Sequence, residues 1–281
     1  MKKLLITTAA LSFALAGCQI TYTEPPKFEH NKNDVYVWDD SKSTAKNWAD
    51  IAVVPNGVKD AERAGDAQEL ISEAEQNAWT LVSLASGGLA QGLGMSSVFG
   101  VIDEAQNWKP TFVIPLEPQN LNSNDVLEIV RQSLKPVLDA SEKFEYLGLS
   151  YRTNSHHIAN AGFFVSGEGC PVTVAYEKIK GNYLNAPVGK TGCLMDIDIK
   201  VMPRAQLSDG QIKDIVSFEL VGLRNNAIHF ASLYKNPVIF PVGFPVNIDG
   251  KNIDMPFPFV WYNSKMHLFT ESNAMLDMTL N

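Results

Sequence analysis

Strand patterns follow one another almost without interruption from Phe144 to the C-terminus, and this succession most constrains the fold. Short apolar and β-branched runs alternate there with Gly, Pro and Asn, which is typical of antiparallel sheets. Asn225 and its neighbours suit a hairpin turn, and the prolines of 238–246 predict an edge strand or an extended cover. The other runs predicted as strands are 144–151, 172–176, 194–199, 215–223, 227–234, 259–262 and 266–269.

Residues 34–141 mix helix and strand patterns, so the predicted fold class is α+β, with a β-rich antiparallel part at 142–281. The runs 34–38, 51–54 and 111–115 indicate strands, and a capping-box spacing at Asp66 indicates a helix start. A second helix is predicted after Asn124, and Pro136 should kink it or end its first part. With the strands on either side, this helix predicts a β-α-β unit.

The first 17 residues have the three parts of an export signal. Lys2 and Lys3 precede an apolar run, and the run is shorter than the roughly 20 residues that a transmembrane helix needs. Leu15-Ala16-Gly17-Cys18 resembles the lipobox of bacterial lipoproteins. That resemblance implies cleavage after residue 17 and acylation of Cys18, which would become the mature N-terminus. The alternative is an ordinary secretory signal. Residues 18–33 are then expected to form a lipid-anchored tether.

The lipoprotein resemblance also implies a location and a membrane partner. Gln19 follows the cysteine, and because aspartate at that place favours the inner membrane in this family, glutamine implies the outer membrane. Removing 1–17 takes away two lysines and no acid, so the formal net charge of −8 becomes −10. Such a chain lacks the basic surface that nucleic acid requires, and no nucleic-acid partner is expected.

Cys170 and Cys193 are the cysteines that remain once Cys18 is acylated. Export places them in an oxidising compartment, where a disulfide is the default. The alternative, a reactive or metal-binding pair, is disfavoured because the spacing is not CxxC and no histidine lies between them. We therefore predict a disulfide that joins the starts of two strands.

Residues 78–102 form a segment of 25 residues with no charge, the length of a membrane span. In a helix, Gly88, Gly92, Ser96 and Gly100 would line one stripe and allow a second backbone to approach closely. One interpretation is a buried helix broken into a hairpin at its paired glycines. The other is an oligomer seam or a membrane-inserting hairpin. The lipobox with this segment resembles, in plan only, the surface-exclusion lipoproteins of conjugative plasmids, and no residue role is carried over.

No residue pattern indicates a catalytic residue, a metal site or a cofactor. His156 and His157 are adjacent, so their side chains diverge and fit a solvated loop or a helix cap. Ser166 lacks the spacing of a nucleophile elbow and fits a flexible loop. Asp196 and Asp198 share one face of a strand and fit a solvent-facing sheet edge. His229 and His267 are each expected in strands.

The sequence thus predicts an outer-membrane lipoprotein that acts as a non-enzymatic binding or envelope-assembly component. Its expected partner is the membrane, through the acyl chains, with a protein partner or a homo-oligomer as open alternatives. The second hypothesis is a multimeric membrane-inserted lipoprotein that uses the glycine stripe. The third is a periplasmic enzyme of unknown class.

Overall fold

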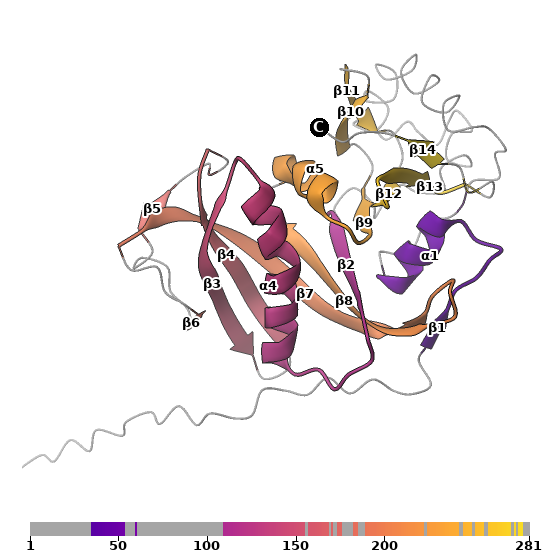
Figure 1. The fold of residues 1–281 in the computed structure, drawn as a ribbon, viewed down its shortest axis with the longest axis horizontal. Helices are drawn as coiled ribbons and strands as arrows, with labels where there is room; N and C mark the ends of the chain where they lie inside the picture. Colours follow the sequence, from indigo (N-terminus) through magenta and orange to yellow (C-terminus); the bar gives the residue numbers. More distant parts are fainter. Residues whose placement is uncertain are drawn as a thin grey trace, which may run out of the picture.

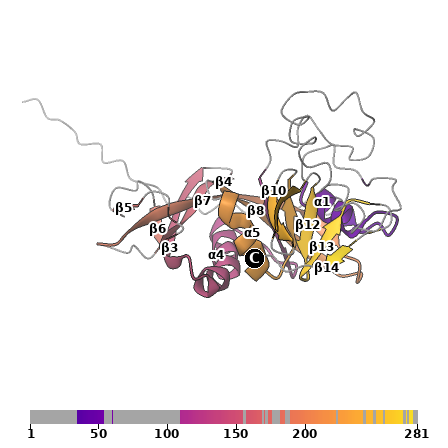
Figure 2. The same cartoon turned by 90° about the horizontal axis from the view of Figure 1, so that it is seen from above.

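The computed structural model describes residues 35–53, 60, 109–154, 157–168, 170, 173–175, 182–184, 189–221, 224–241, 244–248, 251–255, 258–270, 273 and 275–277. They form an α+β fold with one large sheet that carries helices on both faces (Figures 1 and 2). The helices are α1 (Thr44–Ile51), α4 (Ser123–Ala140) and α5 (Arg224–Leu233).

The large sheet has the strand order β14-β13-β12-β9-β2-β8-β7-β4-β3-β6, and neighbours along this path are antiparallel. In addition, β1 pairs with β7 in parallel and β5 pairs with β7 in antiparallel fashion. The strands of this sheet are β1 (Val35–Val37), β2 (Thr111–Leu116), β3 (Glu145–Asn154), β4 (His157–Ser166), β5 (Val174–Ala175), β6 (Asn182–Leu184), β7 (Thr191–Gln206), β8 (Ile212–Val221), β9 (Val238–Phe240), β12 (Phe259–Tyr262), β13 (Lys265–Leu268) and β14 (Met275–Asp277). A separate hairpin is formed by β10 (Phe244–Ile248) and β11 (Lys251–Met255).

The predicted succession of strand, helix and strand is confirmed as β2, α4 and β3, but the two strands are not neighbours. Strands β8, β7 and β4 lie between them. Since each successive pair on this path is antiparallel, β2 and β3 run in the same direction, and α4 crosses one face of the sheet to connect them (Figure 1). The residues before 141 and those after it therefore share one sheet.

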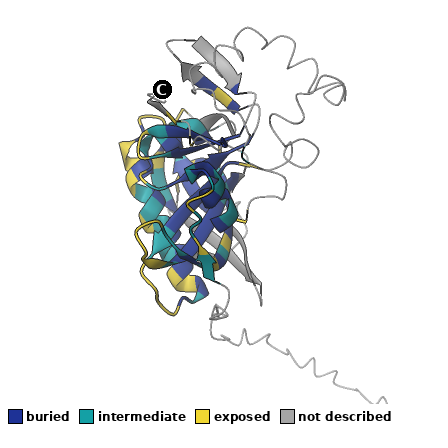
Figure 3. Cartoon of the chain, turned by 90° about the vertical axis from the view of Figure 1, so that its right-hand side faces the viewer, coloured by how far each residue is buried: buried dark blue, intermediate teal, exposed yellow. Residues whose placement is uncertain are grey.

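Helices α4 and α5 cover one face of the sheet and close the larger core. Asn122 forms a capping box with Asp125 at the start of α4, which satisfies the first free N–H groups of that helix. Pro136 neither ends nor divides the helix, which continues to Ala140. Pro136 and Gln132 are exposed, so water can bind the carbonyl group that the proline leaves without a partner. Figure 3 shows the buried residues concentrated in the sheet and the exposed ones on the outer surface.

Helix α1 covers part of the opposite face and closes a second core. Trp48 and Ile51 pack there against β2, β8, β9 and β12. The rest of this face carries polar side chains of β7, among them Asp196, which is exposed, and Asp198. Because β7 lies between β4 and β8, the two aspartates lie on an open sheet face and not, as we predicted, at a sheet edge.

Residues 224–233 are helical, and the prediction of a strand at 227–234 after a hairpin turn is wrong. The buried members Ala227, Phe230, Ala231 and Tyr234 have the i, i+3, i+4, i+7 spacing of a helix facing a core. Arg224 begins the first turn of α5, so this segment contains no hairpin turn. His229, expected in a strand, therefore lies on a helix.

Two further strand predictions are wrong. Residue Ile51 ends α1 and Ala52 caps it, so 51–54 does not begin a strand. Strand β9 lies inside the sheet between β2 and β12, although the prolines of its segment predicted an edge. The prolines flank β9 and leave its own N–H groups available for pairing. The carbonyl group of Pro237 itself accepts a hydrogen bond from the Val113 N–H at 2.9 Å.

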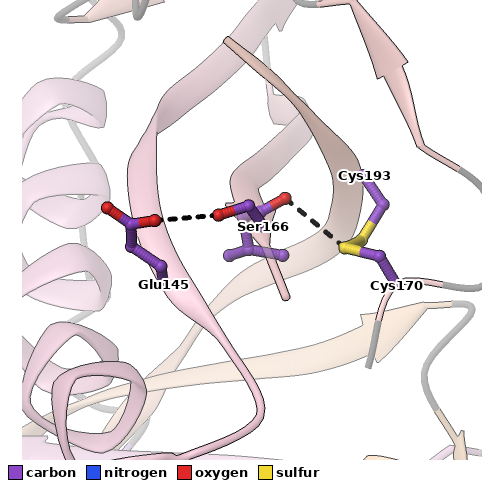
Figure 4. Close-up of a disulfide and its surroundings, with 5 residues drawn as sticks. Glu145, Ser166, Cys170 and Cys193 are labelled. Atoms are coloured by element: carbon purple, nitrogen blue, oxygen red, sulfur yellow. Dashed lines mark hydrogen bonds between the residues drawn. A yellow bond between two sulfur atoms is a disulfide. The ribbon is translucent and has the colours of Figure 1, made fainter. Parts of the chain in front are cut away.

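The predicted disulfide between Cys170 and Cys193 is present, with a Cα–Cα distance of 5.6 Å (Figure 4). Cys193 lies near the start of β7 and pairs with Val165 of β4. A Cβ atom on Gly192 would lie 2.2 Å from the Val165 carbonyl oxygen, which explains the glycine beside this cysteine. Ser166 ends β4 and donates a hydrogen bond to Glu145 at 3.0 Å, so it is not part of a flexible loop.

Replacing both disulfide cysteines with alanine should lower the free energy of unfolding by about 3 kcal/mol. The bridge joins residues 23 positions apart, and in the chain-entropy model a loop of this size gives that value. For a domain of this size the melting temperature should then fall by about 6–12 °C. Thermal melting with and without a thiol reductant measures it. Reductant should destabilise the wild type and leave the double variant unchanged; equal melting temperatures would contradict the prediction.

Several sequence predictions fall outside the described residues. They are the signal segment with Cys18, the tether, the helix start at Asp66, and the uncharged segment 78–102 with Gly88, Gly92, Ser96 and Gly100. In the described part of the chain, no helix combines the length and the apolar character that crossing a bilayer requires.

Candidate functional site: an aromatic pocket beside helix α1

A pocket of about 390 Å³ opens where α1 meets the turn between β7 and β8 and the hairpin of β12 and β13. These elements come together on the right-hand side of Figure 1. Trp38, Trp48, Tyr262 and His267 line the pocket, together with polar and apolar residues from the two turns and from β14. Segments more than 200 residues apart in the chain therefore build one site.

Helix α1 is held at the pocket by the buried side chain of Asn47. Its Oδ1 accepts hydrogen bonds from the Tyr36 hydroxyl and from the Asp39 N–H, each at 2.9 Å. Its Nδ2 donates to the carbonyl oxygens of Asp39 at 2.9 Å and of Ser43 at 3.0 Å. One side chain thus ties β1, the following loop and the first turn of α1 together, and the next residue of the helix is Trp48.

The start of α1 is fixed by two more contacts. Ser43 caps the helix by accepting a hydrogen bond from the Lys46 N–H at 2.9 Å, and its own N–H donates to Asp60 at 2.8 Å. The Thr44 N–H donates to the Asn273 side chain at 3.0 Å, which links the helix to the segment before β14. Hydrogen bonds to Asp60 and Asn273 therefore hold the start of α1, the helix that carries Trp48.

The aromatic side chains of the pocket meet at steep angles. The rings of Trp38 and Trp48 lie 5.7 Å apart with an interplanar angle of 80°, and those of Trp48 and Tyr262 lie 5.5 Å apart at 65°. Edge-to-face contacts of this kind are energetically favourable, and they favour one orientation of each ring relative to its neighbour. Trp38, Trp48 and Tyr262 thus form a connected aromatic group that lines the pocket.

Two buried polar atoms, on residues that line the pocket, have no hydrogen-bond partner among the described residues: Trp48 Nε1 and His267 Nδ1. The exposed fractions of these residues are 2% and 6%. His267 Nε2 lies 3.3 Å from the Tyr262 carbonyl oxygen, which places the imidazole proton on Nε2 and leaves a lone pair on Nδ1. An unpaired buried polar group costs about 1–3 kcal/mol. Both atoms have almost no accessible surface, so they lie behind the wall of the pocket and do not face the cavity.

Acid should destabilise the protein through His267. Burial lowers the pKa of its imidazole, an effect that the Tyr262 carbonyl opposes and Lys265 reinforces. The unfolded chain, with a histidine pKa of about 6.5, then binds more protons than the folded chain as the pH falls below that value. Stability is therefore complete above about pH 6.5 and declines below it.

The matching measurement is the free energy of unfolding of the wild type and of His267→Gln between pH 7.5 and 5. The wild type should lose more stability than the variant, by up to about 1.4 kcal/mol per pH unit. Burial also lowers the pKa of His229, so His229→Gln is measured in parallel to separate the contribution of that histidine to the loss of stability in acid. If the loss for His267→Gln equals that of the wild type, His267 is not held neutral in the fold.

Ser141 and His229 form a contact that resembles a nucleophile with its base. Ser141 Oγ lies 2.9 Å from His229 Nε2, and burial lowers the pKa of the imidazole. Ser141 is only 7% exposed, however, and its Oγ also accepts the Lys143 N–H at 3.2 Å. The contact therefore caps the end of α4 and holds α5 against it, and it does not offer a hydroxyl group to a substrate.

The structure does not bring the residues weighed for chemistry in the sequence together at one site. His157 begins β4, Ser166 ends it, and Asp196 and Asp198 lie on the open face of β7. Within the described part of the chain, no group of three or more His, Cys, Asp or Glu side chains could hold a metal ion. His267 lies in the last hairpin, as predicted, but its role at the pocket was not foreseen.

The pocket could not be found from spacing in the sequence. Its walls come from residues 38 and 48 at one end of the chain and 262 and 267 at the other. The available signal was compositional: Trp38 and Trp48 lie close together in sequence, and Tyr262 and His267 occupy one hairpin. Comparisons with protein-family models, with curated proteins and with solved structures find no match to this chain.

Proposed function

We propose that this protein is an outer-membrane lipoprotein whose folded body binds a small ligand of the cell envelope in the aromatic pocket, without chemical conversion. The observation that carries the binding function is a cavity of about 390 Å³ that is lined by Trp38, Trp48, Tyr262 and His267 and by polar residues of two turns. Ligand pockets combine mainly apolar walls with a few directed polar groups, and this volume lies in their usual range.

The location part of the proposal rests on the lipobox-like Leu15-Ala16-Gly17-Cys18 and on Gln19. Acyl chains on Cys18 would hold the body at the membrane, since each buried CH₂ contributes about 0.8 kcal/mol. A binding role is favoured over an enzymatic one because the serine–histidine contact of the described residues is buried. The membrane-inserted oligomer remains a prediction about residues 78–102.

The binding proposal is tested by blocking the pocket from its rim. Ser208 is exposed and lines the pocket, whereas Gln211, also exposed in the same turn, does not. We expect the dialysable fraction of lysozyme-treated cell envelopes to raise the melting temperature of the wild type and of Gln211→Trp. It should not raise that of Ser208→Trp, because a ligand stabilises only the state that binds it.

Thermal melting of the three full-length proteins in detergent gives the comparison. An increase confined to the wild type and Gln211→Trp supports a ligand in the pocket. An equal increase in Ser208→Trp would show that the ligand binds elsewhere, and no increase in any protein would contradict the binding function.

A further inference from the structure

We propose that acid opens the pocket: when the imidazole of His267 takes up a second proton, the hairpin of β12 and β13 separates from helix α1. The hairpin and the helix both line the pocket, so their separation removes one of its walls. The opening is a property of the fold itself. Its consequence, the release of a bound ligand in acid, rests on the binding function proposed above.

The closed pocket accommodates one proton on the imidazole of His267. Nε2 lies 3.3 Å from the Tyr262 carbonyl oxygen, and because a carbonyl oxygen only accepts, Nε2 carries the proton of the neutral ring. Nδ1 is buried and has no acceptor among the described residues. A second proton on Nδ1 would create a charged donor without a partner in a buried residue, which the closed state strongly disfavours.

The charges on the hairpin oppose a second proton on His267 as well. Burial lowers the pKa of His267, the Tyr262 carbonyl opposes that shift, and the positive charge of Lys265 on the same strand reinforces it. Residues 259–262 of β12 include no charged side chain. Asp277 of β14 is paired in register with Lys265, whereas Met275 is paired with His267.

The acidic residues of the other two walls have partners of their own. Asp50 of α1 pairs with Lys42 at 3.1 Å and also with Lys46. Asp209, in the turn between β7 and β8, accepts the Gln211 N–H at 2.9 Å. None of the described carboxylates therefore forms a hydrogen bond with Nδ1 of His267.

The hairpin belongs to short strands at one end of the sheet. Strands β12 and β13 have 4 residues each and β14 has 3, whereas the central β7 and β8 have 16 and 10. Figure 1 shows these short strands beside α1. The rings of Tyr262 and Trp48, 5.5 Å apart, join the hairpin to the helix, and Tyr262 also supplies the carbonyl group that holds His267. Short strands at the end of a sheet open locally at a lower free energy than its centre.

Opening of the hairpin should take up a proton. In the open state His267 has an ordinary pKa of about 6.5, and in the closed state its pKa is lower. The equilibrium constant for opening should therefore be constant above pH 6.5 and should rise by up to about tenfold per pH unit below it.

The test is native-state hydrogen exchange of the full-length lipoprotein in detergent at pH 7.5 and 5.0, without urea and at low urea. Amides of the hairpin, 259–268, should exchange through an opening that is more frequent than global unfolding and nearly independent of urea, since it exposes little surface. This opening should be more frequent at pH 5.0, after correction for the intrinsic effect of pH on exchange. Paired amides of β4 and β7, at 161–165 and 193–197, should show the urea dependence of global unfolding.

Three variants test the assignment to His267. His267→Gln keeps a donor for the Tyr262 carbonyl but cannot be protonated, so its hairpin should open equally often at both pH values. His229→Gln is the matched control, because burial also lowers the pKa of this histidine on α5, and it should keep the wild-type increase. Should His267→Gln unfold, Lys265→Gln replaces it. Loss of the positive charge raises the pKa of the closed state, so the increase in acid should be smaller.

Two results of the exchange experiment would overturn the opening. One is a hairpin that shares its opening frequency and urea dependence with β7 at pH 5.0, because it would then open only with the whole fold. The other is an increase in acid that is equally large in His267→Gln.

Ligand release is measured separately with the dialysable envelope fraction. The fraction should raise the melting temperature of the wild type less at pH 5.0 than at pH 7.5, and this difference should be smaller in His267→Gln. An equal increase at both pH values in the wild type would overturn the release. No increase at pH 7.5 would contradict the binding function alone, and hydrogen exchange would still decide whether acid opens the pocket.

Discussion

Replacing Cys18 with serine is expected to transfer nearly all of the protein from the membrane fraction to the soluble fraction, or to leave an uncut precursor. The lipobox-like segment implies that the Cys18 sulfur carries the acyl chains, and serine cannot take them in that form. Several acyl chains bind a bilayer far more firmly than one, so their loss removes the whole anchor. Cell fractionation with mass spectrometry of the N-terminal peptide measures the change.

Gln19→Asp is the companion variant for the sorting step. It leaves Cys18 in place, so the protein should remain membrane-bound but move to the inner membrane. If Cys18→Ser keeps its mass, its cleavage and its membrane retention, the lipoprotein proposal is wrong. Outer-membrane retention of Gln19→Asp would overturn only the sorting step.

Replacing Asn47 with leucine is expected to lower the free energy of unfolding by about 4 kcal/mol. The change leaves two partly buried donors, the Tyr36 hydroxyl and the Asp39 N–H, without their acceptor. It also leaves the carbonyl oxygens of Asp39 and Ser43 without their donor, and each of the four lost hydrogen bonds costs about 1 kcal/mol. The melting temperature should fall by about 8–16 °C. Ligand binding should weaken as well, because Asn47 positions the turn of α1 that carries Trp48.

Asn124→Leu is the matched control for Asn47→Leu, since Asn124 lies exposed in the first turn of α4. Its effect should remain within about 0.5 kcal/mol, as for most surface substitutions. Chemical denaturation of both variants decides the result. Equal stability of Asn47→Leu and the wild type would show that α1 is held to the sheet by other contacts.

Strands with alternating or aromatic patterns could be predicted from the sequence, and so could the existence of helix α4. The helix was predicted after Asn124, whereas its capping residue is Asn122, which forms a capping box with Asp125. The turn after Tyr262 is a local signal of the last hairpin. The disulfide could be predicted because the lipobox-like segment implies export and acylation of Cys18, which leaves two cysteines and one pairing. The order of the strands in the sheet could not be predicted from the sequence. Strands β2 and β3 are separated in the sheet by three strands that come later in the chain.

The secondary structure of α5 was predicted wrongly from its local sequence pattern. Its residues include Ile228, Phe230 and Leu233, which suit a strand as well as a helix, and the preceding Asn225-Asn226 suits a turn. The helix is favoured because Phe230 and Tyr234 pack into the core on one side. Tertiary packing thus overrode a weak local preference.

The candidate site was missed for a different reason. Trp48 lies on a segment whose continuation was predicted as a strand, and His267 was interpreted only as a hairpin residue. Neither side chain is unusual within its own element. Their significance arises from the sheet, which brings the last hairpin beside α1, so that both side chains line one pocket.

The central claim is that the pocket lined by Trp48 is a ligand site. Its most direct test is the ¹H–¹⁵N spectrum of the five tryptophan indoles, with Trp48 and Trp261 assigned by their phenylalanine variants. On addition of the dialysable envelope fraction, the Trp48 indole resonance should shift and saturate because Trp48 lines the pocket, while that of Trp261, which does not line it, stays in place. A Trp48 resonance that does not move, in a protein whose spectrum remains that of the folded state, would contradict the claim.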